Sequence, residues 1–293
     1  MQALSIVGAV DPPASAAGGS CEPLKMRKRA GPDEAAAREQ IKASGQSEEI
    51  VNLMKKHVDA TRVQEAGFRA LADLYVNKNN NQVTVAGLGV IEVVLAGMEN
   101  AHTVVEMQKQ GCRALHFLSH NNDDNQVKVV ALGGIEAVIR GMRIHAGAAG
   151  VQQWGSLALS SLSGNDETRV KVARLGGIEQ VLVGMRASPR AAGLQEAACV
   201  ALNNLCFNEA TQDRVAGLSG IKAVLLGMRS HPGAAGVQAQ GCALLGNLCR
   251  HAENLKRMKS LGTVQEVVER ARAAHPSNGD LQAWGEDVLG KLA

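Results

Sequence analysis

One stretch of sequence, residues 194–206 (LQEAACVALNNLC), recurs five more times along the chain, beginning at residues 63, 107, 151, 237 and 281. Its second residue is always glutamine, and successive glutamines are separated by 44, 44, 43, 43 and 44 residues. A period in the forties is typical of helical repeat arrays. Each unit contacts only its neighbours, so such an array forms one continuous solenoid. The invariant positions are Gln64, Gln108, Gln152, Gln195, Gln238 and Gln282.

The composition limits which residue types can form the core and which classes of partner are expected. Apolar residues make up 45% of the chain and aromatic residues only 2%, so the core must consist of Leu, Val, Ile, Ala and Met. A net charge of +3 gives no basic stripe, and nucleic acid is not an expected partner. No apolar run reaches transmembrane length. The apolar first ten residues lack a basic region, so a signal peptide is not expected either.

Five of the six cysteines occupy two fixed places in the repeats. Stacked helices lie about 8–10 Å apart, beyond the roughly 7 Å Cα separation that a disulfide spans. We therefore expect reduced, buried thiols, which fits a cytoplasmic or nuclear compartment. One place holds Cys112, Cys199 and Cys242, and the other holds Cys206 and Cys249.

Residues 1–45 differ in composition from the rest and are predicted to form a disordered tail, because Pro, Ala, Gly and Ser dominate residues 11–20 and bury little apolar surface. Within it, a short helix from Asp33 to Ser44 is compatible with the pattern. The basic run from Lys25 to Arg29 is interpreted as a solvated charge cluster. The alternatives are a nuclear import signal and a membrane-surface contact.

Residues 46–293 are predicted to form the repeat domain. A first, incomplete unit of two helices lies near residues 47–78. Five full units follow near residues 79–121, 122–164, 165–207, 208–250 and 251–293. Each full unit has a short first helix, a Leu-Gly-Gly-Ile-Glu turn, an amphipathic second helix, a loop and the recurring stretch as the third helix. The first glycine of the turn is expected in the left-handed region. Glu286 replaces a smaller residue in the last unit and predicts a polar terminal face.

Charged residues and histidines each recur at fixed positions of the repeat, here called columns, and either column could be interpreted as a ligand-binding site. Glutamates such as Glu92 begin the second helix and arginines such as Arg143 end it; compensation of the helix dipole is preferred to a ligand stripe. Histidines such as His145 and His231 recur in the following loop. Their spacing of about 10 Å or more does not suit zinc, which needs ligands about 2 Å from one ion. No metal and no cofactor are expected.

The sequence of helices, the Gly-Gly turn and the ending Ala-Leu-x-Asn-Leu resemble armadillo repeats over residues 47–293. The Leu-Gly-Gly-Ile-Glu and Ala-Ala-Gly-Val-Gln segments are most similar to the armadillo region of leucine-rich-repeat kinases and of protist armadillo proteins. This resemblance implies an all-α fold, a right-handed superhelix whose third helices line a concave groove. Members hold extended peptides there with a ladder of asparagines and with tryptophans four residues earlier. Here only Asn204 and Asn247 match the asparagine place and no tryptophan matches, which argues against a receptor for nuclear localisation signals.

Helical phase at 100° per residue adds the place seven residues before the asparagine to the groove face. Phe117 and Trp154 are two of the six aromatic residues, and they are expected either to bind the partner or to be partly buried between repeats. The glutamine column lies on the opposite side and is interpreted as structural. The peptide-groove candidates are Arg69, Asp73, Gln110, Arg113, Phe117, Trp154, Leu157, Ser161, Val200, Asn204, Gln240 and Asn247.

Three functions compete at this point. The favoured one is a non-catalytic scaffold or adaptor that holds an extended segment of a partner protein in the groove. The second is a regulatory or structural module that uses its convex face or its ends, and that is formerly or elsewhere linked to signalling domains. The third is an enzyme, which is not favoured because the repeats carry no catalytic set or phosphate loop.

Overall fold

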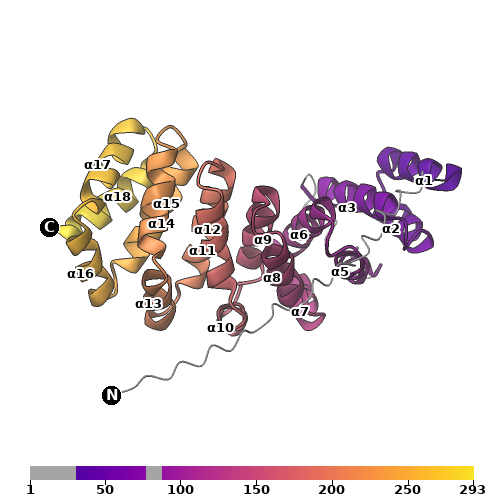
Figure 1. Cartoon of the computed structure of the whole chain (residues 1–293), viewed down its shortest axis with the longest axis horizontal. Helices are drawn as coiled ribbons and strands as arrows, with labels where there is room; N and C mark the ends of the chain where they lie inside the picture. Colours follow the sequence, from indigo (N-terminus) through magenta and orange to yellow (C-terminus); the bar gives the residue numbers. More distant parts are fainter. Residues whose placement is uncertain (1–30, 77–87) are drawn as a thin grey trace, which may run out of the picture.

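The computed structural model describes residues 31–76 and 88–293, and within this part every element of secondary structure is a helix. The helices stand side by side in one elongated array, with α1–α3 at one end and α16–α18 at the other (Figure 1). The expected all-α solenoid is confirmed. The expected first helix of the unit at 79–121 falls largely on residues 77–87, outside the described residues.

The helices fall into three rows. First helices are α7 (Asp123–Ala131), α10 (Asp166–Arg174), α13 (Glu209–Gly217) and α16 (Ala252–Leu261). Second helices are α2 (Ser47–Lys56), α5 (Val90–Asn100), α8 (Gly134–Ile144), α11 (Gly177–Ala187), α14 (Gly220–Ser230) and α17 (Val264–Ala274). Third helices are α3 (Thr61–Val76), α6 (Val105–Ser119), α9 (Ala149–Ser161), α12 (Ala192–Leu205), α15 (Ala235–Leu248) and α18 (Gly279–Leu292). Each third helix packs against the third helix of the next unit.

The end of the predicted tail differs from the structure. Residues Pro32–Ala43 form α1, with Gly31 rather than Asp33 as its N-cap and Pro32 in its first turn. Ala37 and Ile41 are buried, and α1 packs on α3 where the third helix of a preceding unit would lie. The array therefore includes one docked helix before residue 46, because two apolar residues among charged ones suffice to dock it; the division into tail and repeat domain otherwise stays a prediction. Residues 1–30 lie outside the described residues.

The turn between first and second helices forms as the glycine pattern predicts. Gly89, Gly133 and Gly176 have φ between 77° and 88°, and Gly262 has φ 64°. This left-handed region favours glycine because it lacks a Cβ. Ser219 holds the same conformation in the fifth unit, with φ 63°, and carries the strain that glycine avoids elsewhere.

Three of the four described first helices, α7, α10 and α13, begin with an asparagine side-chain cap. Asn165 accepts a hydrogen bond from the backbone N–H of Thr168, and Asn208 does the same for Thr211, each completed as a capping box. Such caps satisfy N–H groups that have no partner within the helix. Below them, one core runs through the units from Ala37 to Val288. It consists mainly of Leu, Val, Ile, Met and Ala, as the composition predicts, with buried cysteines and one aromatic residue, Phe68.

Candidate protein-binding face

The glutamine column joins the second and third helices of each unit. The Nε2 of Gln152, for example, donates to the carbonyl oxygens of Met142 and His145, at 2.7 and 3.0 Å. These carbonyls lie at the end of the second helix and have no partner within it. The same pair of bonds recurs at Gln64, Gln108, Gln195, Gln238 and Gln282. The structural interpretation of this column is confirmed, although the bonds lie within a unit.

The glutamines also touch the next unit. A Cβ added at Gly184 would lie 2.8 Å from the Oε1 and 3.0 Å from the Cβ of Gln152 in the preceding unit. Gly141 and Gly227 face Gln108 and Gln195 in the same way. The glycine near the end of α8, α11 and α14 thus lets each of these helices approach the preceding unit closely.

The charge and histidine columns also connect neighbouring units. Glu92 pairs with Lys128 at 2.9 Å, and Glu179 with Arg214 at 2.6 Å, in each case across to the first helix of the next unit. The Nε2 of His231 lies 2.9 Å from the carbonyl oxygen of Pro189 in the preceding loop, and His145 and His275 make equivalent contacts. Among the described residues, no group of three or more His, Cys, Asp or Glu is placed to hold a metal ion.

The exposed stripe of the third helices, here called the third-helix face, is rotated slightly from its predicted position. On α12, Glu196, Val200 and Asn204 reach solvent, whereas Ala197, seven places before Asn204, is only 3% exposed. Gln110 occupies that same place on α6 and is 4% exposed. This place is thus buried on α6 and α12, whereas on α9 and α15 it holds Trp154 and Gln240, which are partly exposed. Gln110 is therefore buried at the edge of this face, and its role in a peptide groove stays a prediction.

An aromatic cluster of Arg113, His116, Phe117 and Trp154 forms the middle of the third-helix face. The rings of Phe117 and Trp154 lie 5.6 Å apart between centroids. The Arg113 guanidinium lies 5.6 Å from the Phe117 ring and 5.5 Å from the Trp154 ring, and it pairs with Asp73 at 2.7 Å. Both aromatic side chains are half-buried, as expected for residues partly buried between repeats, and their role in binding a partner stays a prediction. A cation placed on these ring faces is favourable and fixes the cluster.

His116 belongs to this cluster although its place in the repeat was not among the predicted ones. Its Nδ1 lies 2.7 Å from the Ser161 hydroxyl and 3.2 Å from the carbonyl oxygen of Leu157. Burial, with the nearby His120, lowers the pKa of His116 to about 4. The imidazole is therefore neutral at pH 7 and joins α6 to α9 without adding charge to the face.

Polar side chains continue the face beyond the aromatic cluster. The Nδ2 of Asn204 donates to the Ser160 hydroxyl at 2.8 Å, and that of Asn247 donates to the Oδ1 of Asn203 at 3.1 Å. Asn203 also approaches Gln240 at 3.4 Å. These amides are oriented across unit boundaries, where their remaining donors and acceptors can meet a peptide backbone.

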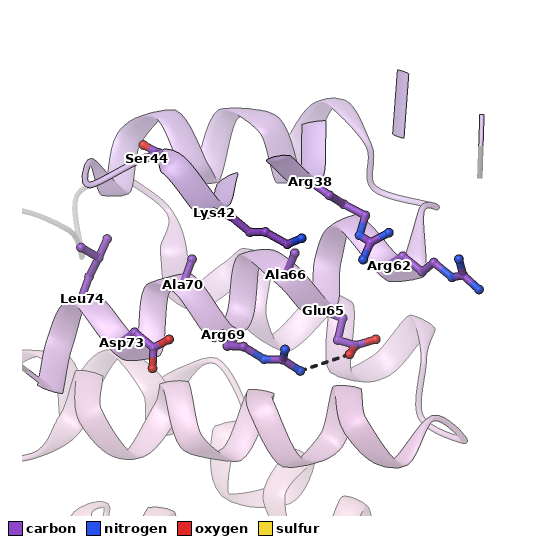
Figure 2. Close-up of a pocket in the computed structure, with 10 residues that line it drawn as sticks. All are labelled: Arg38, Lys42, Ser44, Arg62, Glu65, Ala66, Arg69, Ala70, Asp73 and Leu74. Carbon is purple, nitrogen blue, oxygen red and sulfur yellow. Dashed lines mark hydrogen bonds and ion pairs between the residues drawn. The ribbon is translucent and has the colours of Figure 1, made fainter. Parts of the chain in front are cut away.

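Three hollows lie along this face. The largest, about 600 Å³, lies between α1 and α3 and includes Arg69 and Asp73 (Figure 2). A second of about 360 Å³ is lined by Leu157, Ser161, Val200 and Asn204 among others. A third of about 280 Å³ includes Gln240 and Asn247. Eight of the twelve predicted residues line these three hollows, and three others, Arg113, Phe117 and Trp154, belong to the aromatic cluster.

The five cysteines that the structure describes are buried and give no reactive group to this surface. Burial raises the pKa of Cys112, Cys199, Cys206 and Cys242 to about 12, and that of Cys249 to about 11. Such thiols remain protonated at neutral pH, and a protonated thiol is a poor nucleophile. In the part of the chain that the structure describes, no helix combines the length and apolar character needed to cross a membrane.

Comparison with solved structures identifies the fold. The chain is similar to a designed armadillo repeat protein, with a TM-score of 0.68 and 14% sequence identity, over 85% of this chain and 99% of that one. A structure from work on a phosphorylation switch in the interaction between cadherin and beta-catenin aligns at a TM-score of 0.48 and 16% identity, over 87% of this chain and 54% of that one. No protein-family model and no curated protein sequence matches. The resemblance to leucine-rich-repeat kinases stays a prediction.

Proposed function

We propose, from the premise of an armadillo-repeat fold, that this protein is a non-catalytic scaffold that holds an extended segment of a partner protein on its third-helix face. The observation that carries the proposal is the half-exposed pair Phe117 and Trp154, whose centroids lie 5.6 Å apart on adjacent third helices. In a chain with only 2% aromatic residues, two that meet at the centre of one surface are strong candidates for binding anchors. Tryptophan in particular is enriched among residues that dominate interface energetics.

The polar residues on either side support an extended ligand. Asn204 and Asn247 stand one unit apart on α12 and α15, and each is held by a neighbouring side chain. An asparagine amide both donates and accepts, so a row of them suits a peptide backbone. Such hydrogen bonds contribute about 0.5–1.5 kcal/mol each, whereas an aromatic anchor contributes about 2 kcal/mol or more. Affinity should therefore depend mainly on the aromatic pair.

The test is selection of displayed random peptides on the purified chain, followed by measurement of affinity for the selected peptides. Trp154→Ala should weaken binding by at least tenfold, and an Asn204→Ala/Asn247→Ala double variant should weaken it less. Leu226→Ala, at a 48% exposed residue on α14, is the matched apolar truncation away from the face and should leave affinity unchanged. Circular dichroism confirms that each variant is folded. Unchanged affinity in both face variants would refute the proposal.

A second candidate is a module that binds through its first helices. Val127 on α7 and Val170 on α10 occupy the same place in consecutive units and are 63% and 53% exposed. Two such valines on one row favour a contact surface, because apolar patches on a monomer often mark interaction sites. A Val127→Ser/Val170→Ser variant would lose partner binding under this alternative and would keep it under the first.

A further inference from the structure

We infer that the hollow between α1 and α3 recognises an anionic side chain of the bound segment, a carboxylate or a phosphate. This inference rests on the proposed function and adds a chemical requirement to it. The hollow lies at the end of the third-helix face where α1 takes the place of a preceding third helix. A segment lying along the face would enter it at that end.

The charges that line the hollow are unbalanced. Four cations, Arg38, Lys42, Arg62 and Arg69, face two anions, Glu65 and Asp73. Three of these six groups are engaged beyond the hollow as well: Lys42 pairs with Glu39 at 2.7 Å, Arg69 with Glu106 at 3.1 Å and Asp73 with Arg113 at 2.7 Å. Glu65 lies 3.4 Å from Arg69. Within the described residues, Arg38 and Arg62 make no ion pair.

Arg38 has a second feature that points to a ligand. Its Nε is buried and has no hydrogen-bond acceptor within the described residues. Arg38 and Lys42 reach from α1 toward α3, while Ala66 and Ala70 present only methyl groups beneath them (Figure 2). The small alanines leave the space open, and a buried N–H without an acceptor is unfavourable. An oxyanion in this space would accept from the terminal N–H groups of Arg38 and would balance the excess positive charge.

The guanidinium group selects the ligand chemistry. Its planar fork of N–H donors matches the paired oxygens of a carboxylate or a phosphate. A volume of about 600 Å³ lies within the range of ligand sites and accommodates a segment rather than a single ion. The first 30 residues of this chain do not suit the hollow, because they contain two acidic and four basic residues. RNA is disfavoured, because Glu106 and Asp287 interrupt the positive charge of the same face.

The experiment compares three forms of the whole chain against a displayed library of random dodecapeptides. These are the wild type, Arg38→Gln/Arg62→Gln, and the control Arg143→Gln/Arg174→Gln, which removes two exposed arginines outside the third helices. The wild type and the control should enrich peptides with an acidic residue near one end. The Arg38→Gln/Arg62→Gln variant should enrich peptides that retain the apolar residue but lose this acidic preference.

Synthetic versions of one selected peptide then identify the anion. Peptides with glutamate, phosphoserine or glutamine at the acidic position are titrated by fluorescence anisotropy. Glutamine should weaken binding to the wild type about tenfold, the scale of one charge-assisted contact, and should make less than a twofold difference in the arginine variant. The stronger of the glutamate and phosphoserine peptides tells which anion the site prefers.

The outcomes separate this inference from the proposed function. Selected peptides that depend on Trp154 but show no acidic preference, or an acidic preference that survives Arg38→Gln/Arg62→Gln, overturn the anion site and leave the scaffold intact. Failure to select any peptide overturns both. A single-stranded RNA that binds the wild type as tightly as the acidic peptide, with the same dependence on Arg38 and Arg62, also overturns the inference in favour of a nucleic-acid ligand.

Discussion

Substituting Gly184 by alanine tests whether close contact between units stabilises the solenoid. Gly184 lies in α11 and is buried, and an added Cβ would meet the Oε1, Cβ and Cγ of Gln152 at 2.8, 3.0 and 3.1 Å. Gln152 is fully buried, and its two hydrogen bonds to the end of α8 hold it in place. The new methyl group must therefore move α9 against α11 or displace the glutamine.

Two opposing effects decide the magnitude. Alanine is favoured over glycine inside a helix by about 1 kcal/mol. Overpacking costs about 1–3 kcal/mol, and loss of the two Gln152 hydrogen bonds costs about 0.5–1.5 kcal/mol each. Taken together, these costs of about 2–6 kcal/mol less the gain of about 1 kcal/mol should lower the unfolding free energy by about 1–5 kcal/mol. Gly290→Ala is the matched control, since a Cβ there meets nothing within 4 Å and should raise stability by at most about 1 kcal/mol.

Urea unfolding followed by circular dichroism measures both variants. Repeat arrays can unfold in stages, so a second probe such as tryptophan fluorescence must give the same transition before free energies are compared. A Gly184→Ala protein that is as stable as the wild type, or that gains stability as Gly290→Ala does, would refute the reasoning. The contact between glycine and glutamine would then be incidental to the stacking of the units.

The remaining predictions concern strain, protonation and thiol reactivity. Ser219→Gly should raise the unfolding free energy by about 1 kcal/mol by relieving a left-handed serine, measured by the shift of the urea midpoint. Because burial lowers the pKa of His116 to about 4, the unfolded chain binds more protons between pH 4 and 6.5; stability should fall by up to about 3 kcal/mol as pH drops through this window, and His116→Gln should lose that part of the slope. Cys112 and Cys199, whose pKa values are raised to about 12, should resist Ellman's reagent at pH 8 until urea unfolds the protein; mass spectrometry that finds them modified in the folded chain would contradict their burial.

The fold was largely predictable because local signals and the repeat agree. Gly89, Gly133 and Gly176 were expected in the left-handed region and are found there. The bonding of the glutamines was not predictable, because their acceptors, carbonyls ten and seven residues earlier, come within reach only when the third helix folds back on the second. The ion pairs between units, such as Glu92 with Lys128, depend in the same way on tertiary packing.

The candidate site was less predictable than the fold. Helical phase predicts which side of a third helix carries the candidate residues, but the direction from which neighbouring helices pack decides which edge of that side is buried. Gln110 shows this effect, since it shares a place with Trp154 yet is only 4% exposed. His116 could have been found from its column, where Ser160 and Asn203 are also polar. The contribution of α1 was missed because Ala37 and Ile41 give too short a pattern to indicate docking.

Ligand binding in the hollow between α1 and α3 depends on the equilibrium between docked and undocked α1. Arg38 and Lys42 line the hollow only while α1 lies on α3, and Ala37 and Ile41 are the buried residues of that helix. So small an apolar contact places α1 among the segments that open before the rest of a protein unfolds. The apparent dissociation constant of any ligand is then the intrinsic one divided by the docked fraction. By linkage, a ligand in the hollow must slow amide hydrogen exchange throughout α1.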